Sequence, residues 1–151
     1  MRHAKSDWAA DFSSDHERPL NTRGVEAARQ MGALLTEFDQ VPDRIISSTA
    51  VRARTTAALA AESGKWGLEP SLESRFYGTG PDTVLEVVRA VDGADKLLIV
   101  GHQPTWGMLV HALTGGHVEM KTATVAILEC PIDDWSDLGE GDLVLLLHPS
   151  R

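Results

Sequence analysis

A chain of 151 residues with 42% apolar residues is long enough for one compact domain with a substantial core, which makes disorder and fibrous repeats poor interpretations. The formal net charge of -8 argues against broad electrostatic binding to nucleic acid or to an anionic membrane surface, so any anion site must be local. The longest apolar runs are far shorter than the roughly 20 residues that span a bilayer. We therefore expect a single domain over residues 1–151, with neither a nucleic-acid partner nor a membrane helix.

Helical and extended patterns alternate along the chain. Apolar residues recur at helical spacing over residues 24–38, with Asn21 and Thr22 as candidate caps. The same patterns predict further helices at residues 50–62, 81–91 and 105–114, and strands at residues 43–48, 68–72, 96–100, 124–130 and 142–148. The last two strands should form an antiparallel pair, joined by an acidic stretch that is typical of a solvated loop. Strands alternating with helices predict a three-layer α/β/α sandwich, whose sites lie outside the carboxyl ends of its strands.

Cysteine usage and the start of the chain bear on its location. Cys130 is the only cysteine, which excludes an internal disulfide and fits a reducing compartment. It is best explained as a small buried hydrophobe in a strand. The first residues, Met1 to Lys5, lack the apolar segment of a signal peptide, so we expect a cytoplasmic protein.

Three basic segments fall where the expected architecture places its sites. The pair Arg2 and His3 opens the chain, Arg52 follows the first expected strand, and His102 follows the strand at residues 96–100. Two imidazoles and two guanidiniums can bind a phosphoryl group and break its bond without a metal. Arg54 lies two positions beyond Arg52 and should point to another helical face, so we assign it to solvent.

The histidine pattern does not favour a metal site. Four further histidines have no partners at ligand spacing and are expected at the surface or in structural contacts: His16, His111, His117 and His148. A zinc ion on His3 and His102 would need a third ligand, and the neighbouring arginines would oppose a cation. We expect neither a metal nor a cofactor.

Together these segments resemble the histidine phosphatase superfamily, also called phosphoglycerate mutase-like, and most of all its small SixA-like phosphohistidine phosphatases. The matching segments are residues 2–6, 18–24, 48–56 and 100–104, and residues 122–129 and 148–149 also resemble that branch. The resemblance covers nearly the whole chain. It implies a phosphoglycerate mutase-like sandwich and a metal-independent phosphatase.

The resemblance also implies a role for each site residue. His3 is the implied nucleophile, which forms a phosphohistidine intermediate that water later hydrolyses. Arg2 and Arg52 are the implied phosphate clamps, His102 the implied contact to the phosphoryl oxygens, and the Gln103 amide a further candidate ligand of the phosphate.

Two residues of the matching segment 18–24, Arg18 and Thr22, each have two possible roles. Arg18 either holds the loop that follows His3 or contacts the substrate. Thr22 lies where the family often places a threonine that lines the pocket, but its position also suits a helix cap.

The chain departs from the family pattern at the general acid. Larger members carry a carboxylate that protonates a poor alkoxide leaving group. In the corresponding region Glu73 and Asp82 are only candidates for this role. If no acid reaches the leaving group, the labile P–N bond of a phosphohistidine should be favoured over the ester bond of a phosphosugar.

The second departure concerns the usual first strand, which appears missing or truncated. The family normally has an apolar strand before its Arg-His pair, whereas only Met1 precedes Arg2 here. Either the chosen start lies downstream of the native one, or Met1 to Lys5 packs differently. We expect a gap in the sheet with unpaired backbone groups, a loosely held His3, and higher activity and stability in a chain extended upstream.

These patterns predict a phosphatase that acts on protein phosphohistidine or on a small phosphorylated compound. A small-molecule phosphomonoesterase of the same superfamily is one alternative. A non-catalytic phosphate-binding module is another, which the missing first strand makes plausible.

Overall fold

The computed structural model describes residues 1–150, in which two small sheets lie between two layers of helices. β1 (Arg44–Ser48), β2 (Ser71–Glu73) and β3 (Leu97–Val100) form a parallel sheet in the order β2-β1-β3, and β4 (Val125–Glu129) and β5 (Asp142–Leu147) form an antiparallel pair. The helices are α1 (Thr22–Glu37), α2 (Val51–Gly64), α3 (Pro81–Arg89) and α4 (Thr105–Thr114), with short 3-10 turns η1 (Asp15–Glu17), η2 (Ser74–Phe76) and η3 (Trp135–Asp137). Within the described part of the chain, every helix is too short or too polar to cross a bilayer.

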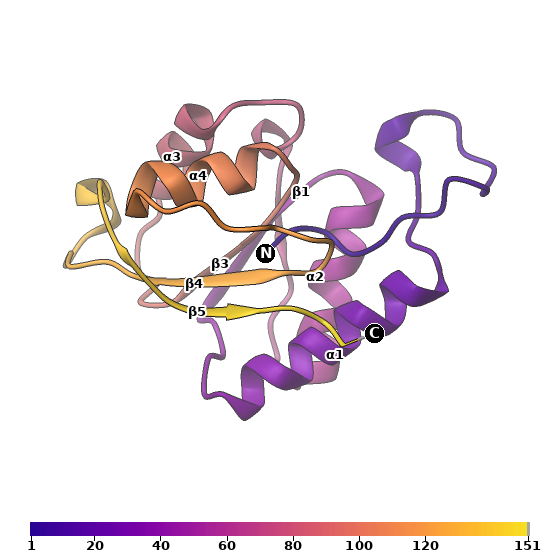
Figure 1. Ribbon diagram of the computed structural model, residues 1–151, viewed down its shortest axis with the longest axis horizontal. Helices are drawn as coiled ribbons and strands as arrows, with labels where there is room; N and C mark the ends of the chain where they lie inside the picture. The colour runs from indigo at the N-terminus through magenta and orange to yellow at the C-terminus, as the bar shows by residue number, and fades with distance from the viewer. Residues whose placement is uncertain (151) are drawn as a thin grey trace.

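The helices pack on opposite faces of the strands, as the three-layer prediction requires. α3 and α4 lie on one face and α1 and α2 on the other (Figure 1). α1 and α2 can approach closely because small residues line their contact: a Cβ added at Gly32 would lie 2.1 Å from the carbonyl oxygen of Ala60. The predicted sandwich and the antiparallel pair of the last two strands are confirmed.

Most element boundaries differ from the sequence prediction by one or two residues, and two of the differences have a local reason. α1 begins at Thr22, two residues earlier than expected, because the Asn21 side chain accepts the Gly24 N–H and caps the helix. β2 begins at Ser71 rather than at residue 68. The chain before it packs back against α1, where the Trp66 indole donates to the Thr36 hydroxyl at 2.8 Å.

The first three residues join the two sheets. On one side Arg2 pairs in parallel with Gly101, and the His3 N–H donates to the Gly101 carbonyl at 2.9 Å. On the other side the Arg2 N–H donates to the Thr124 carbonyl at 3.0 Å, just before β4. The backbone of His3 is thus anchored to both sheets, so the expectation of a loosely held His3 is wrong.

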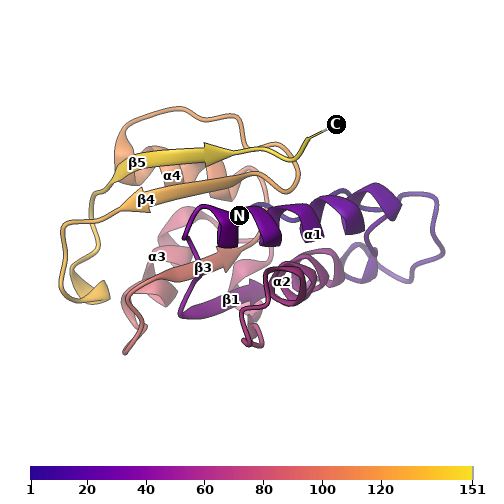
Figure 2. The same cartoon turned by 90° about the horizontal axis from the view of Figure 1, so that it is seen from below.

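The expected gap is present, but it lies behind Met1 instead of around His3. β3 and β4 lie on either side of the N-terminus (Figure 2), and in residues 1–150 each pairs with a neighbouring strand along one edge only. A cavity of about 530 Å³ lies between their free edges, lined in part by Leu97 of β3 and Ala126 of β4. The backbone hydrogen bonds between the parallel sheet and the β4–β5 pair therefore run through residues 1–3, while side chains of both sheets share the same apolar clusters.

Candidate active site

The predicted basic segments meet at the carboxyl ends of β1 and β3. Arg2 and His3 lie beside Gly101 at the end of β3, and Arg52 is in the first turn of α2, which follows β1. The His3 and His102 rings are 5.2 Å apart between centroids, and the charges of both arginines act on both rings. The fold brings all four residues together.

The contacts of His3 determine which of its nitrogens can react. The ring is buried, and Nδ1 lies 2.7 Å from the Ala4 carbonyl oxygen. A carbonyl oxygen only accepts, so Nδ1 carries the proton and Nε2 keeps its lone pair. Burial first, with smaller contributions from the neighbouring His102 and Arg52, lowers the pKa of His3 to about 3. At neutral pH His3 is therefore an uncharged imidazole with a nucleophilic Nε2.

His102 is held by a residue that the sequence suggested only as part of a motif. Its Nε2 lies 2.8 Å from the Ser48 hydroxyl, which already accepts the Ala50 N–H at 3.2 Å. The Ser48 hydroxyl proton is then free to point at Nε2, which favours the tautomer with a proton on Nδ1. Burial first, and the charge of Arg52 second, lower the pKa of His102 to about 4. His102 can thus offer a neutral N–H from Nδ1.

Three buried polar atoms near His3 have no hydrogen-bond partner among residues 1–150. They are Arg2 Nε, Arg52 Nε and His102 Nδ1. The Arg2 guanidinium is oriented by a bond from Nη1 to the Met120 carbonyl oxygen at 3.0 Å. Buried polar groups are nearly always paired, so three unpaired ones beside one nucleophilic nitrogen indicate a site for an anionic ligand such as a phosphoryl group.

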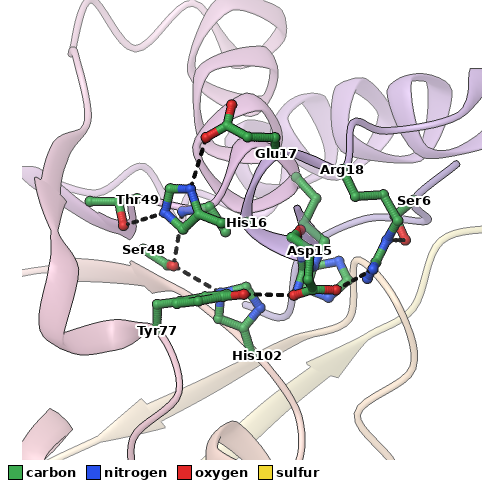
Figure 3. A network of polar contacts seen from close by, with 12 residues as sticks. Ser6, Asp15, His16, Glu17, Arg18, Ser48, Thr49, Tyr77 and His102 are labelled. Carbon is green, nitrogen blue, oxygen red and sulfur yellow. Dashed lines mark hydrogen bonds and ion pairs between the residues drawn. The ribbon is translucent and has the colours of Figure 1, made fainter. Parts of the chain in front are cut away.

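Outside these groups lies a cluster of hydrogen-bonded polar side chains, some of which were not predicted from the sequence. The Asp15 carboxylate accepts from Arg52 Nη2 at 3.0 Å and from the Tyr77 hydroxyl at 2.7 Å, and it forms an ion pair with Arg18 (Figure 3). The Tyr77 hydrogen bond, followed by the contact with Arg52, lowers the pKa of Asp15 to about 2. Neither Asp15 nor Tyr77 was predicted, although Asp15 precedes Arg18 by three residues, the spacing of a local ion pair.

Arg18 is buried, and its contacts support one of the two roles proposed for it, that of holding the loop after His3. Its Nε donates to the Ser6 hydroxyl at 2.9 Å while Nη1 contacts Asp15. These contacts hold the loop that follows His3, and a contact of Arg18 with the substrate stays a prediction.

The other two predicted ligands are Gln103, which has a structural partner, and Thr22, which is exposed. The Gln103 Oε1 accepts the Gly107 N–H at 2.6 Å in the first turn of α4, so only its NH2 group is left for a phosphate. Thr22 is exposed at the start of α1, where Asn21 is the cap. Roles for Thr22 and Gln103 in substrate binding stay predictions, whereas the solvent exposure predicted for Arg54 is confirmed.

The candidate acids are either bound to another side chain or exposed. Both carboxylate oxygens of Glu73 bind Arg75, at 2.8 and 3.2 Å, and Asp82 is exposed in the first turn of α3. His16 lies near the site, with its ring edge-on to Tyr77 at 4.9 Å between centroids and Nε2 at 2.9 Å from the Thr49 hydroxyl. We assign His16 a structural contact rather than a ligand role.

Comparison with known proteins defines the family. The model of the histidine phosphatase superfamily (branch 1) matches residues 1–80. The structure of the putative phosphohistidine phosphatase SixA from Nakamurella multipartitia superposes with a TM-score of 0.86 at 29% identity, over 100% of this chain and 94% of that chain. Phosphohistidine phosphatase SixA of Escherichia coli K12 is 29% identical over 140 residues, which are 89% of this chain and 84% of SixA.

A second kind of relative is a 2,3-bisphosphoglycerate-dependent phosphoglycerate mutase of Mycobacterium leprae. It is 31% identical over 105 residues, which are 65% of this chain and 42% of the mutase. The chain belongs to the histidine phosphatase superfamily. Within it the chain is SixA-like, with the phosphoglycerate mutase-like fold, and these similarities support phosphatase activity on phosphorylated substrates.

Proposed function

We propose that this protein is a metal-independent phosphohistidine phosphatase in which His3 is the nucleophile. The observation that carries the proposal is the set of three unpaired buried atoms, Arg2 Nε, Arg52 Nε and His102 Nδ1, beside an imidazole whose Nε2 is unprotonated. A phosphoryl group bound there would satisfy all three atoms.

In the first step the Nε2 lone pair of His3 attacks phosphorus while the bond to the leaving nitrogen breaks. That electron pair stays on the leaving imidazole, which departs as a neutral ring because its other nitrogen already carries a proton. The phosphoryl group in transfer spreads its charge over three oxygens. Arg2, Arg52 and the Nδ1–H of His102 are the donors that stabilise this charge.

In the second step a water oxygen attacks the phosphorus of the phosphorylated His3. The P–N bond breaks, its electron pair returns to Nε2, and the proton of water passes to phosphate or to solvent. The bond from Nδ1 to the Ala4 carbonyl keeps the ring in the same orientation through both steps.

The state of the candidate acids supports a leaving group that needs little protonation. Glu73 is bound to Arg75, and Asp82 is exposed. Asp15 is close, but its low pKa keeps it ionised at neutral pH, so it has no proton to donate. An imidazole leaves phosphorus readily, whereas an alkoxide requires an acid.

A second candidate function is hydrolysis of small phosphomonoesters. The similarity to the mycobacterial phosphoglycerate mutase favours it, because that relative is named for a phosphorylated small molecule. Under this alternative the same His3 chemistry acts on an alkyl ester.

Turnover of a phosphohistidine-containing protein and of a sugar phosphate, each with and without EDTA, tests the proposal. We expect release of phosphate from the phosphohistidine protein, no loss with EDTA, and no turnover by a His3→Ala variant. Faster turnover of the sugar phosphate would favour the second candidate, and inhibition by EDTA would contradict a metal-independent reaction.

A further inference from the structure

The carboxylate of Asp15 accepts hydrogen bonds from residues of three separate segments. Oδ2 takes Arg52 Nη2 and the Tyr77 hydroxyl, and Oδ1 takes Arg18 Nη1 (Figure 3). The backbone carbonyl of Asp15 accepts Arg52 Nη1 at 2.7 Å. The Asp15 side chain is 50% exposed, whereas those of Arg18 and Arg52 are 6% and 7% exposed. Asp15 thus covers two buried guanidiniums from the solvent side.

This arrangement divides the donors of Arg52 into two sets. Its Nη atoms bind Asp15, and its Nε stays without a partner. Arg18 is likewise taken up by Asp15 and Ser6. A phosphoryl group can use Arg52 Nε, but a second anionic group on the same substrate would find both outer guanidiniums paired and a carboxylate between them.

The loop that carries Asp15 adds to the same effect. Residues 7–19 hold four carboxylates and a single arginine, Arg18, which gives the segment a formal charge of -3 (one minus four). The carboxylates other than Asp15 are those of Asp7, Asp11 and Glu17. Like charges that are only partly screened repel each other across several ångströms. Asp15 is the carboxylate that contacts Arg18 and Arg52, so its charge acts on a bound substrate at short range, while solvent screens the more distant carboxylates of the loop.

We propose that Asp15 is a specificity-determining residue that selects against phosphorylated compounds whose leaving group carries a second anionic group. The class that remains has a neutral or cationic leaving group next to the phosphorus, such as an imidazole or an amine. This inference rests on the proposed phosphatase function and narrows its substrate class.

A matched pair of substrates tests the proposal: 3-carboxyphenyl phosphate and its methyl ester, which differ by one negative charge near the phosphoryl group. The measured quantity is the ratio of kcat/KM for the acid to kcat/KM for the ester. In the Asp15→Asn variant we expect this ratio to rise about tenfold, because the amide keeps the size and an acceptor oxygen but loses the charge. A general loss from poorer positioning of Arg52 lowers both values and cancels in the ratio.

The control is Asp11→Asn, which removes the same charge from an exposed position of the same loop. It should leave the ratio within about twofold of the parent, since solvent screens its charge. An unchanged ratio in Asp15→Asn would overturn the proposal and leave Asp15 as a residue that only positions Arg52. An equal rise in both variants would also overturn it, since the effect would then be one of net charge.

The proposal can also be tested on the parent chain alone, so that the result does not depend on whether a variant folds. Inhibition constants for inorganic phosphate and pyrophosphate should show pyrophosphate binding at least about tenfold more weakly. Equal or tighter binding of pyrophosphate would contradict the role of Asp15. If the parent releases phosphate from neither the acid, the ester nor a phosphohistidine protein, the proposed function itself fails, whatever the inhibition constants show.

Discussion

The inner and outer parts of the site use similar residues in opposite ways. The floor, defined here as Arg2, His3 and His102, has one buried and two half-buried side chains, and it has buried donor atoms without partners. The rim, defined as Asp15, Arg18 and Tyr77, has its polar groups bound to one another. Arg52 belongs to both, since its Nε faces no partner and its Nη atoms bind the rim.

This difference between floor and rim suggests that one arginine-rich pocket binds the phosphoryl group with its unpaired donors and selects among substrates with its paired ones. Unpaired buried donors gain most from an incoming anion, because they are already removed from water. Paired donors gain little and serve to hold the loop in place. We therefore expect substitutions in the floor to affect turnover of every substrate, and those in the rim to change which substrate is preferred.

The largest loss short of removing the nucleophile should come from Arg52→Lys. A lysine keeps the charge but cannot point one donor inward while two others bind Asp15. Each charge-assisted bond is worth about 1.5 to 3 kcal/mol, so loss of one or two should lower kcat/KM by about 10² or more. Arg54→Lys, on an exposed face of the same helix, is the matched control and should stay near the parent. Equal effects of the two variants would mean that Arg52 does not bind the phosphoryl group.

A smaller loss should follow Ser48→Ala. The hydroxyl of Ser48 fixes the tautomer of His102, and without it Nδ1 loses its proton part of the time. We expect kcat to fall about tenfold, the cost of about one hydrogen bond, with little change in KM. Ser47→Ala is the control, because Ser47 is equally buried but its hydroxyl donates to the Ser48 carbonyl. A rise in KM with kcat unchanged would argue against a role of Ser48 in orienting His102.

The floor should also make folding sensitive to mild acid. Burial lowers the pKa of His3 to about 3 from an ordinary value of 6.5. Between these values the unfolded chain binds a proton at His3 that the folded chain does not, so the contribution of His3 to stability falls as pH drops below 6.5 and is constant above it. Urea unfolding at pH 7.5 and pH 5 should show a smaller loss for His3→Gln than for the parent. Identical losses would mean that His3 titrates normally in the folded protein.

The smallest effect on activity should come from filling the gap between β3 and β4. An apolar tetrapeptide appended before Met1 can continue the line of residues 1–3 and bury side chains in the cavity of about 530 Å³. One or two such side chains, at about 1.5 to 3 kcal/mol each, would raise Tm by several degrees. Because His3 is already bonded to both sheets, we expect a larger gain in stability than in kcat. The same extension with two prolines, which cannot donate to a neighbouring strand, should give no gain.

The architecture and the floor could be predicted because their signals are local in sequence. Val84, Leu85 and Val88 mark one face of α3 by spacing alone. Arg52 and Arg54 could be assigned to interior and solvent from helical geometry. The basic segments follow strands, and parallel strands deliver their carboxyl ends to one edge of a sheet.

The rim could not be predicted, because its contacts join residues far apart in sequence. Tyr77 and Asp15 are 62 residues apart, and nothing in the sequence of η2 or η1 indicates that they meet. The firm anchoring of His3 was missed for a similar reason, since it depends on Thr124, which lies just before β4. Pairing of this kind is decided by how the layers pack rather than by any one segment.

The central claim, that His3 Nε2 takes up the phosphoryl group, is tested most directly by trapping the intermediate. The experiment mixes phosphoramidate with the parent chain, quenches the reaction in alkali within milliseconds and analyses the product by mass spectrometry. It is repeated with a His102→Ala variant, which should hydrolyse the intermediate more slowly. We predict one phosphoryl group on the peptide that contains His3, attached at Nε2, and none in His3→Ala. Release of phosphate from an unmodified His3 peptide, or full turnover by His3→Ala, would contradict the account.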